Sequence, residues 1–296
     1  MGSENWGRWG VDDERGALNL LTPEVVKAAV ASIRTGKVYS LGIPIQGHGV
    51  PLLDYRGKPM RLTLADTTDD GMYEFMGMQP GSGTNEDVLV MASHTTSHMD
   101  ALVHMYSENQ HYNGISNKEM KALAGAAKLG IEKVGVIAAR AVMLDMVAYF
   151  DEGDWLTHGR NISGADLEGA ASKQGVEIRA GDIVLIRTGY LDYFFANPNS
   201  QEFAQAGLGG DGARWLASKD VVAVGSDNAA VECIPFHDND FMHVHRILLV
   251  DYGIYMLEFL NLSDLAKDKT YEGFMTVSPL KVTGATGSPI NPVFVA

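Results

Sequence analysis

The chain has 296 residues, of which 46% are hydrophobic and 20% are charged, as is ordinary for a globular protein. Its formal net charge of -14 repels phosphate backbones, and no Lys/Arg-rich run offsets it, so we expect no nucleic-acid partner. The single cysteine, Cys233, can neither form an internal disulfide nor supply a thiolate cluster. Any metal site must therefore use nitrogen and oxygen ligands.

The chain shows no pattern for membrane insertion or secretion. Its apolar stretches fall far short of the roughly 18 residues of a membrane span, and the N-terminus lacks the apolar run of a signal peptide. We therefore expect a cytoplasmic protein without a membrane partner. No repeat or low-complexity segment divides the chain. We expect residues 1–37 to form an N-terminal extension with a helix, packed on a main domain of residues 38–296.

The first predicted element is a helix that Thr22 caps, with Pro23 in its first turn and Glu24 at the positive end of its dipole. It should run through Val25 to Ile33 and stop near Gly36. The elements expected after it are, in chain order, strands over 38–45 and 87–92, a helix from Ser116 with Glu119 in a capping box, a strand over 134–144, a helix from Ser163 with Asp166 in the equivalent place, and strands over 183–188, 221–226, 247–258 with a break at Tyr252, and 274–282. Such mixing without strict alternation predicts an α/β domain around a mixed sheet or barrel-like core.

Four side chains that bind metals or transfer protons lie close together in the sequence: His94, His98, Asp100 and His104. A continuous strand would separate His94 from His104 by about 33 Å, and a regular helix would turn Asp100 and His104 away from the other two. The plausible geometry is a strand that ends near residue 92, followed by a tight loop. Such a loop would bring His94, His98 and Asp100 round one cation and leave His104 near the ion but free of it.

A structural role is the ordinary interpretation of a lone buried histidine. Three histidines and an aspartate at short spacing after a strand end favour a site instead. A second group downstream is weaker: His245 precedes an apolar run and Glu258 ends it, and a turn near Gly253 could fold the two ends together. Considered alone, that stretch is better explained by residues that flank a strand.

The run from His94 to His104 resembles the His-x-Gly-Thr-His-x-Asp-x-Pro-x-His signature of the cyclase family of metal-dependent hydrolases, which includes bacterial kynurenine formamidases and isatin hydrolases. His245, Gly253 and Glu258 are similar to the second metal-binding stretch of that family. The resemblance covers roughly residues 38 to 262. The family's Gly, Thr and Pro are here Thr96, Ser97 and Leu102; none of these departures removes a ligand, so they bear on loop shape and substrate fit more than on metal binding.

The resemblance implies a role for each of these residues. His94, His98 and Asp100 would bind a first ion, and His245 and Glu258 would hold a second, with Asp100 bridging. His104 would be the general acid/base. The implied fold is a swivelling β/β/α domain, and the implied assembly is a homodimer or homotetramer.

These parts predict hydrolysis of a carbonyl compound. One or two Zn²⁺ or Mn²⁺ ions per chain would lower the pKa of a bound water, and His104 would transfer its proton. Amides, formamides, cyclic imides and lactones are all candidate substrates. The alternative is a non-hydrolytic metal protein, either a cupin-like Fe(II) oxygenase with a His/His/Asp triad or a silent binding protein.

Substrate recognition is predicted from aromatic residues near the ligands. Tyr106, Tyr112, Phe236 and Trp9 favour a small cyclic or aromatic substrate, although such residues are as often part of the core. Arg187 is a candidate to bind a substrate carboxylate, or else to pair with Asp182.

Overall fold

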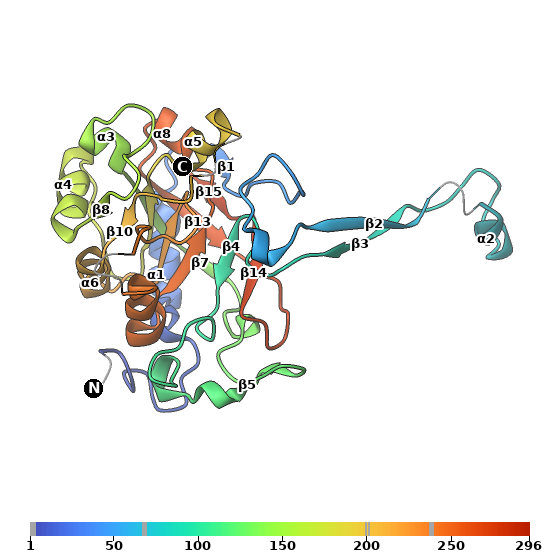
Figure 1. Cartoon of the computed structure of the whole chain (residues 1–296), viewed down its shortest axis with the longest axis horizontal. Helices are drawn as coiled ribbons and strands as arrows, with labels where there is room; N and C mark the ends of the chain where they lie inside the picture. The colour runs from blue at the N-terminus through green and yellow to red at the C-terminus, as the bar shows by residue number, and fades with distance from the viewer. Residues whose placement is uncertain (1–3, 67–69, 199, 201, 237–239) are drawn as a thin grey trace.

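A curled mixed sheet of nine strands forms a half-barrel at the centre of the computed structural model (Figure 1). The structure describes residues 4–66, 70–198, 200, 202–236 and 240–296. In spatial order the strands are β1 (Val38–Ser40), β15 (Val293–Val295), β13 (Glu272–Val277), β7 (Ile137–Asp145), β9 (Ile183–Arg187), β11 (Ala223–Ser226), β12 (Tyr255–Glu258), β4 (His98–Asp100) and β14 (Gly287–Pro289). The predicted α/β class with a mixed, barrel-like sheet is confirmed.

The four central strands, β7, β9, β11 and β12, are parallel, and the remaining pairs are antiparallel. Parallel strands need helical crossovers that cover both faces of the sheet, and their sequences are accordingly continuous apolar runs. Ile183, Val184, Leu185 and Ile186 of β9, for example, are all fully buried. This central block ends at β12, which carries β4 on its outer side.

The helices other than α2 (Asp70–Phe75) lie around this sheet (Figure 1). The capping box predicted at Ser163 is present: its hydroxyl accepts from Asp166 N, and Asp166 accepts from Ser163 N in return. None of the described helices is long and apolar enough to cross a bilayer. The helices are α1 (Pro23–Ala29), α2 (Asp70–Phe75), α3 (Met146–Phe150), α4 (Gly164–Gln174), α5 (Tyr190–Ala196), α6 (Gly210–Ser218), α7 (His243–His245), the π-helix η9 (Arg246–Tyr252) and α8 (Ser263–Lys267), with short 3₁₀ turns at Gly16–Leu20, Val30–Ser32, Asp54–Arg56, Tyr112–Gly114, Asn117–Glu119 and Ile131–Lys133.

Two predicted elements are wrong. The apolar run expected as a strand from residue 247 is helical as far as Tyr252, and only Tyr255–Glu258 form the strand β12. A short apolar run fits a buried helix as well as a buried strand, so its periodicity could not decide. The helix expected from Ser116 is one 3₁₀ turn followed by β5 (Met120–Lys121), which pairs with β6 (Gly125–Ala126).

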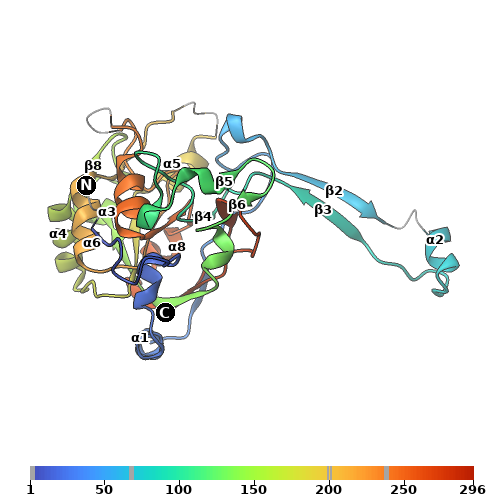
Figure 2. The same ribbon diagram turned by 90° about the horizontal axis from the view of Figure 1, so that it is seen from below.

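Two strands leave the main body as a long arm (Figures 1 and 2). β2 (Met60–Ala65) pairs only with β3 (Glu86–Val90), and α2 lies at the far end. The strand predicted over 87–92 therefore exists, but it belongs to the arm and not to the central sheet. A further two-stranded pair joins β8 (Asn161–Ile162) to β10 (Gly207–Leu208).

The described part of the N-terminal extension packs on the main body. The indole Nε1 of Trp6 donates to the carbonyl of Val250 at 2.8 Å, and Arg8 pairs with Asp220 at 2.5 Å. Helix α1 begins after the Thr22 cap, as predicted, and contacts β7. The division at residue 37 into an extension and a main domain stays a prediction.

Candidate metal centre

Strands β4 and β12 present three of the predicted residues to one point. Residues two apart on a strand share a face, so His98 and Asp100 of β4 point the same way. β12 runs antiparallel to β4, with Met256 opposite Asp100 and Glu258 opposite His98. The sheet register therefore brings Glu258 to the first motif, although the two are far apart in the sequence.

His245 reaches the same point from a helix. It ends α7, and its ring faces Asp100 and Glu258. Nε2 of His245 lies 3.7 Å from Oδ2 of Asp100 and 3.4 Å from Oε1 of Glu258. Nε2 of His98 lies 3.0 Å from Oε2 of Glu258 and 3.7 Å from Oδ1 of Asp100. All four side chains are almost completely buried. The structure thus brings together the two groups that were predicted separately.

The second nitrogen of each of these two histidines is held by an oxygen acceptor. Nδ1–H of His98 donates to the carbonyl of Thr96 at 2.8 Å, and Nδ1–H of His245 donates to a carboxylate oxygen of Glu232. A donor at Nδ1 leaves the lone pair on Nε2, which in both rings points to the carboxylates. Both rings therefore present the tautomer that binds a cation.

Thr96 explains how the loop turns at this point. Its φ of 58° is in the left-handed region, which a β-branched residue rarely adopts and which glycine adopts freely. The resembled signature has glycine at this position, and Thr96 here adopts a conformation that glycine reaches without strain. This strained conformation directs the Thr96 carbonyl to His98.

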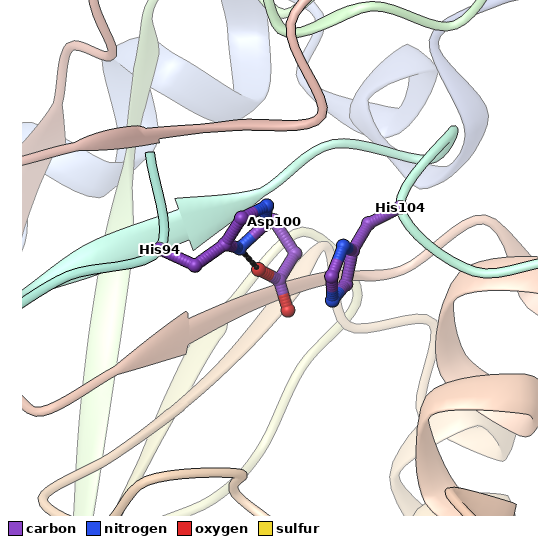
Figure 3. Close-up of side chains that lie close together, drawn as sticks. All are labelled: His94, Asp100 and His104. Carbon is purple, nitrogen blue, oxygen red and sulfur yellow. Dashed lines mark hydrogen bonds and ion pairs between the residues drawn. The ribbon is translucent and has the colours of Figure 1, made fainter. Parts of the chain in front are cut away.

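His94 and His104 complete the cluster on its less buried side (Figure 3). Their rings stack with centroids 4.1 Å apart. Nδ1 of His94 bonds to Oδ1 of Asp100 at 2.7 Å, and its Nε2 bonds to the hydroxyl of Thr286 at 2.9 Å. An ion bound by His94 would have to replace one of these two hydrogen bonds. The ring of His104 makes neither contact and lies 6.1 Å from the ring of His245.

Burial and charge set the protonation of the cluster. Burial lowers the pKa of His104 to about 3, because the attraction of Asp100 is offset by His94 and His245. Burial also acts to lower the pKa of His245, but Glu232 and Glu258 outweigh it and raise the pKa to about 10. Burial acts to raise the pKa of Asp100, but the neighbouring histidines outweigh burial and hold that pKa well below its ordinary value. At neutral pH Asp100 is therefore ionised and His104 is neutral, whereas Glu232 and Glu258 favour a proton on His245 that a cation at Nε2 would displace.

These residues fit a divalent cation. There are two sets of candidate ligand atoms, and within each set all atoms lie within 4.8 Å of one another. One set comes from His94, Asp100 and His104, and the other from Asp100, His245 and Glu258. Nε2 of His98 and Oδ2 of Asp100 are buried without a hydrogen-bond partner. Burial of such polar atoms costs free energy unless a bound ligand supplies the missing contact. Imidazole nitrogens and carboxylate oxygens are the ligands of Zn²⁺ and Mn²⁺.

The residues predicted to bind substrate are scattered. Tyr112 is fully buried in the core and donates to Asp13 at 3.0 Å, so the prediction that it contacts substrate is wrong. Arg187 pairs with Asp145 at 3.0 Å and Asp192 at 2.7 Å, and its predicted pairing with Asp182 is also wrong. The remaining three were Tyr106, which is exposed beside His111, Phe236, whose ring contacts Phe241, and Trp9, which lies under the guanidinium of Arg8.

A largely aromatic cavity of about 620 Å³ is connected to the cluster only through Phe259, and none of the proposed ligands lines it. Phe259 contributes to its wall, and the same ring lies 6.3 Å from the ring of His98 and 6.4 Å from that of Tyr190. A cavity of this size suits a small organic ligand. The residues that make it apolar are Leu52, Tyr190, Tyr193, Phe194, Phe203 and Phe259.

Sequence reasoning missed these aromatic residues and two polar ones, Glu232 and Thr286. Glu232 lies between Val231 and Cys233 and is buried. A carboxylate is rarely buried unless it has a partner. The position of Glu232 within an apolar run could therefore have indicated a paired, buried carboxylate. Thr286 lies in a turn-rich segment that offered none.

Comparisons with known proteins agree with this geometry. The family model described as "Putative cyclase" matches residues 39–233. Cyclase-like protein 3 of Oryza sativa subsp. japonica is 25% identical over 235 residues, which are 77% of this chain and 73% of that protein. The crystal structure of a novel cyclase is 35% identical with a TM-score of 0.88, and the match covers 99% of this chain and 98% of that one.

A more distant structure shares the fold alone. Isatin hydrolase A from Labrenzia aggregata, bound to benzyl benzoate, has a TM-score of 0.63 at 19% identity, over 94% of this chain and 98% of its own. The half-barrel is thus the fold of solved cyclase structures. The chain belongs to the cyclase family.

Proposed function

We propose that this protein is a metal-dependent hydrolase that cleaves the C–N bond of an amide, formamide or cyclic imide, or the C–O bond of a lactone, at the carbonyl carbon. The observation that carries the proposal is the pair of ligand sets that share the buried Asp100. His94 and Asp100 would hold one ion, with His104 beside them, and Asp100, His245 and Glu258 would hold a second. His98 would be a further ligand of the first ion, although its Nε2 here faces Glu258. A bound Zn²⁺ or Mn²⁺ supplies an acidified water and polarises the substrate carbonyl.

Residues of the chain supply the negative charges of the centre and the proton transfer. Asp100 and Glu258 keep their charge in the buried centre because histidines surround them. His104 is neutral at neutral pH, and its low pKa makes the protonated ring a strong acid, so His104 would hold a proton only briefly before giving it to the leaving group. Its stacking on His94 keeps it beside the proposed ligands.

We further propose that the substrate is a small cyclic or aromatic molecule and that the protein is a homodimer or homotetramer. The aromatic cavity beside Phe259 supports the first part, since flat rings pack well against such walls. Isatin hydrolase A, which shares the fold, is named for a cyclic substrate. No observation favours the oxygenase alternative, and a mixed α/β sheet differs from the antiparallel jelly roll of cupins.

The test is an anaerobic assay of formamides, cyclic imides and lactones on protein whose metal content has been measured. We expect turnover without oxygen, lost on treatment with a chelator and in His98→Ala. His48→Ala, at an exposed histidine, is the matched control and should keep wild-type activity. Turnover that requires O₂ and Fe(II) would establish the oxygenase instead, and full activity without metal would end the proposal.

A further inference from the structure

Arg56 is a partly buried arginine that has no carboxylate partner among the described residues. An arginine is rarely withdrawn from water without such a partner, because the loss of hydration costs free energy. The described chain follows this rule elsewhere. The other arginines that are at least partly buried each form an ion pair, and they are Arg140, Arg160, Arg187 and Arg246. The charge of Arg56 is therefore available to a ligand.

This arginine lies against the loop that carries the metal cluster. It ends the 3₁₀ turn Asp54–Arg56, and its Nη1 donates to the backbone carbonyl of His94. The ring of His94 bonds in turn to Asp100. A guanidinium has five N–H donors, and this contact takes up one side of the group. None of the remaining donors of Arg56 is fully buried, so they can reach a ligand beside the cluster.

The ring of Tyr55 fixes the orientation of the guanidinium. The Cζ atom of Arg56 lies over this ring, 5.3 Å from its centroid. An aromatic face attracts a cation without taking up its N–H donors. The ring and the His94 carbonyl therefore hold the group in place and leave free donors, whose planar arrangement fits the two oxygens of a carboxylate.

The neighbouring cavity favours one orientation of an aromatic acid. Asp54 and Tyr55, the two residues before Arg56, are part of the cavity wall, and so is Glu202. No lysine, arginine or histidine is among the described residues of that wall. The charges of Asp54 and Glu202 would repel a carboxylate inside the cavity. An aromatic acid would therefore place its ring in the cavity and its carboxylate at Arg56.

We propose that Arg56 binds a carboxylate of the substrate, and that the substrate is an aromatic acid with a separate hydrolysable carbonyl group. Arg187, which the sequence suggested for this role, is already paired with Asp145 and Asp192. That the bound acid is a substrate rests on the proposed hydrolysis. The preference of Arg56 for a carboxylate does not, and it is measured by binding alone.

The test compares benzoate with benzamide, which share a ring and differ in charge. Saturation-transfer NMR titrations of the full chain, at measured metal content, give both affinities. We expect the wild type to prefer benzoate. Arg56→Gln should weaken benzoate binding about tenfold or more and leave benzamide binding unchanged. Arg179→Gln is the matched control, since the side chain of Arg179 is 59% exposed, and it should bind both probes as the wild type does.

A second variant separates the charge from the support of the loop. The amide of Arg56→Gln can still donate to the His94 carbonyl, whereas Arg56→Met has neither a donor nor a charge. We expect both variants to lose benzoate affinity alike and to keep benzamide affinity. Benzoate affinity retained in Arg56→Gln, or a wild type without preference for benzoate, overturns the proposal. An equal loss of both probes also overturns it, because Arg56 would then only support the loop. Failure of the proposed hydrolysis would appear instead as absent turnover in metal-loaded wild type.

Discussion

His98 and Glu258 face each other as register partners of the antiparallel strands β4 and β12, with Nε2 of His98 3.0 Å from Oε2 of Glu258. Each residue belongs to a different motif of the sequence. A sheet register is fixed by the burial of one whole face, because a slip of one residue would reverse every side chain. The two motifs are therefore aligned by the same packing that holds the core together.

Replacement of His104 should separate catalysis from metal binding. His104→Ala should lower turnover by about 10²-fold or more, the usual scale of general acid–base catalysis, and should keep most of the metal. Steady-state rates and elemental analysis on the same preparation measure both quantities. Wild-type turnover in this variant would contradict the acid/base role, and complete loss of metal would make His104 an obligatory ligand.

Replacement of Glu258 should change the number of ions. Glu258 and His245 share Asp100 with the first ligand set. Titration of the metal-free protein should therefore approach two ions per chain in the wild type and one in Glu258→Gln. Isothermal titration and elemental analysis give the counts. If the wild type already stops at one ion, the two-ion arrangement is wrong and Glu258 acts as a neighbour of a single-ion site.

Glu232 should determine metal affinity without binding the ion. It accepts the Nδ1–H of His245 and so orients the ring. Loss of such a partner typically weakens metal affinity by about 10- to 100-fold, and we expect this for Glu232→Ala. The matched control is Glu168→Ala, at an exposed glutamate of α4, which should bind metal as the wild type does. Equal affinities in the two variants would remove the assigned role of Glu232.

The thiol of Cys233 should resist alkylation in the folded protein. Burial, and then the charge of Glu232, raise the pKa of this thiol to about 11. At pH 8 only about one thiol in a thousand would then be ionised, and the thiolate is the reactive form. Iodoacetamide should therefore modify the native chain slowly, faster as the pH rises towards 11, and rapidly in urea, as intact mass would record. Fast labelling of native protein at pH 8 would show that the thiol is accessible and ionised.

The sequence alone was sufficient for several of the local elements. The caps at Thr22 and Ser163 act within one turn of backbone, and both helices begin where these residues predict. The apolar run of β9 is buried as a parallel strand should be. The short spacing of His94, His98 and Asp100 likewise indicated a site, because few structural arrangements need such ligands so close together.

Tertiary structure decided what local pattern left open. The apolar run after His245 is helical up to Tyr252, because packing and not periodicity selects the form of a buried segment. Tyr112 could not be told from a site residue until the core enclosed it. Glu232 became visible only when the fold carried it to the ring of His245. Such contacts join residues distant in the chain, and their energy depends on burial and register, which arise only when the whole sheet has formed.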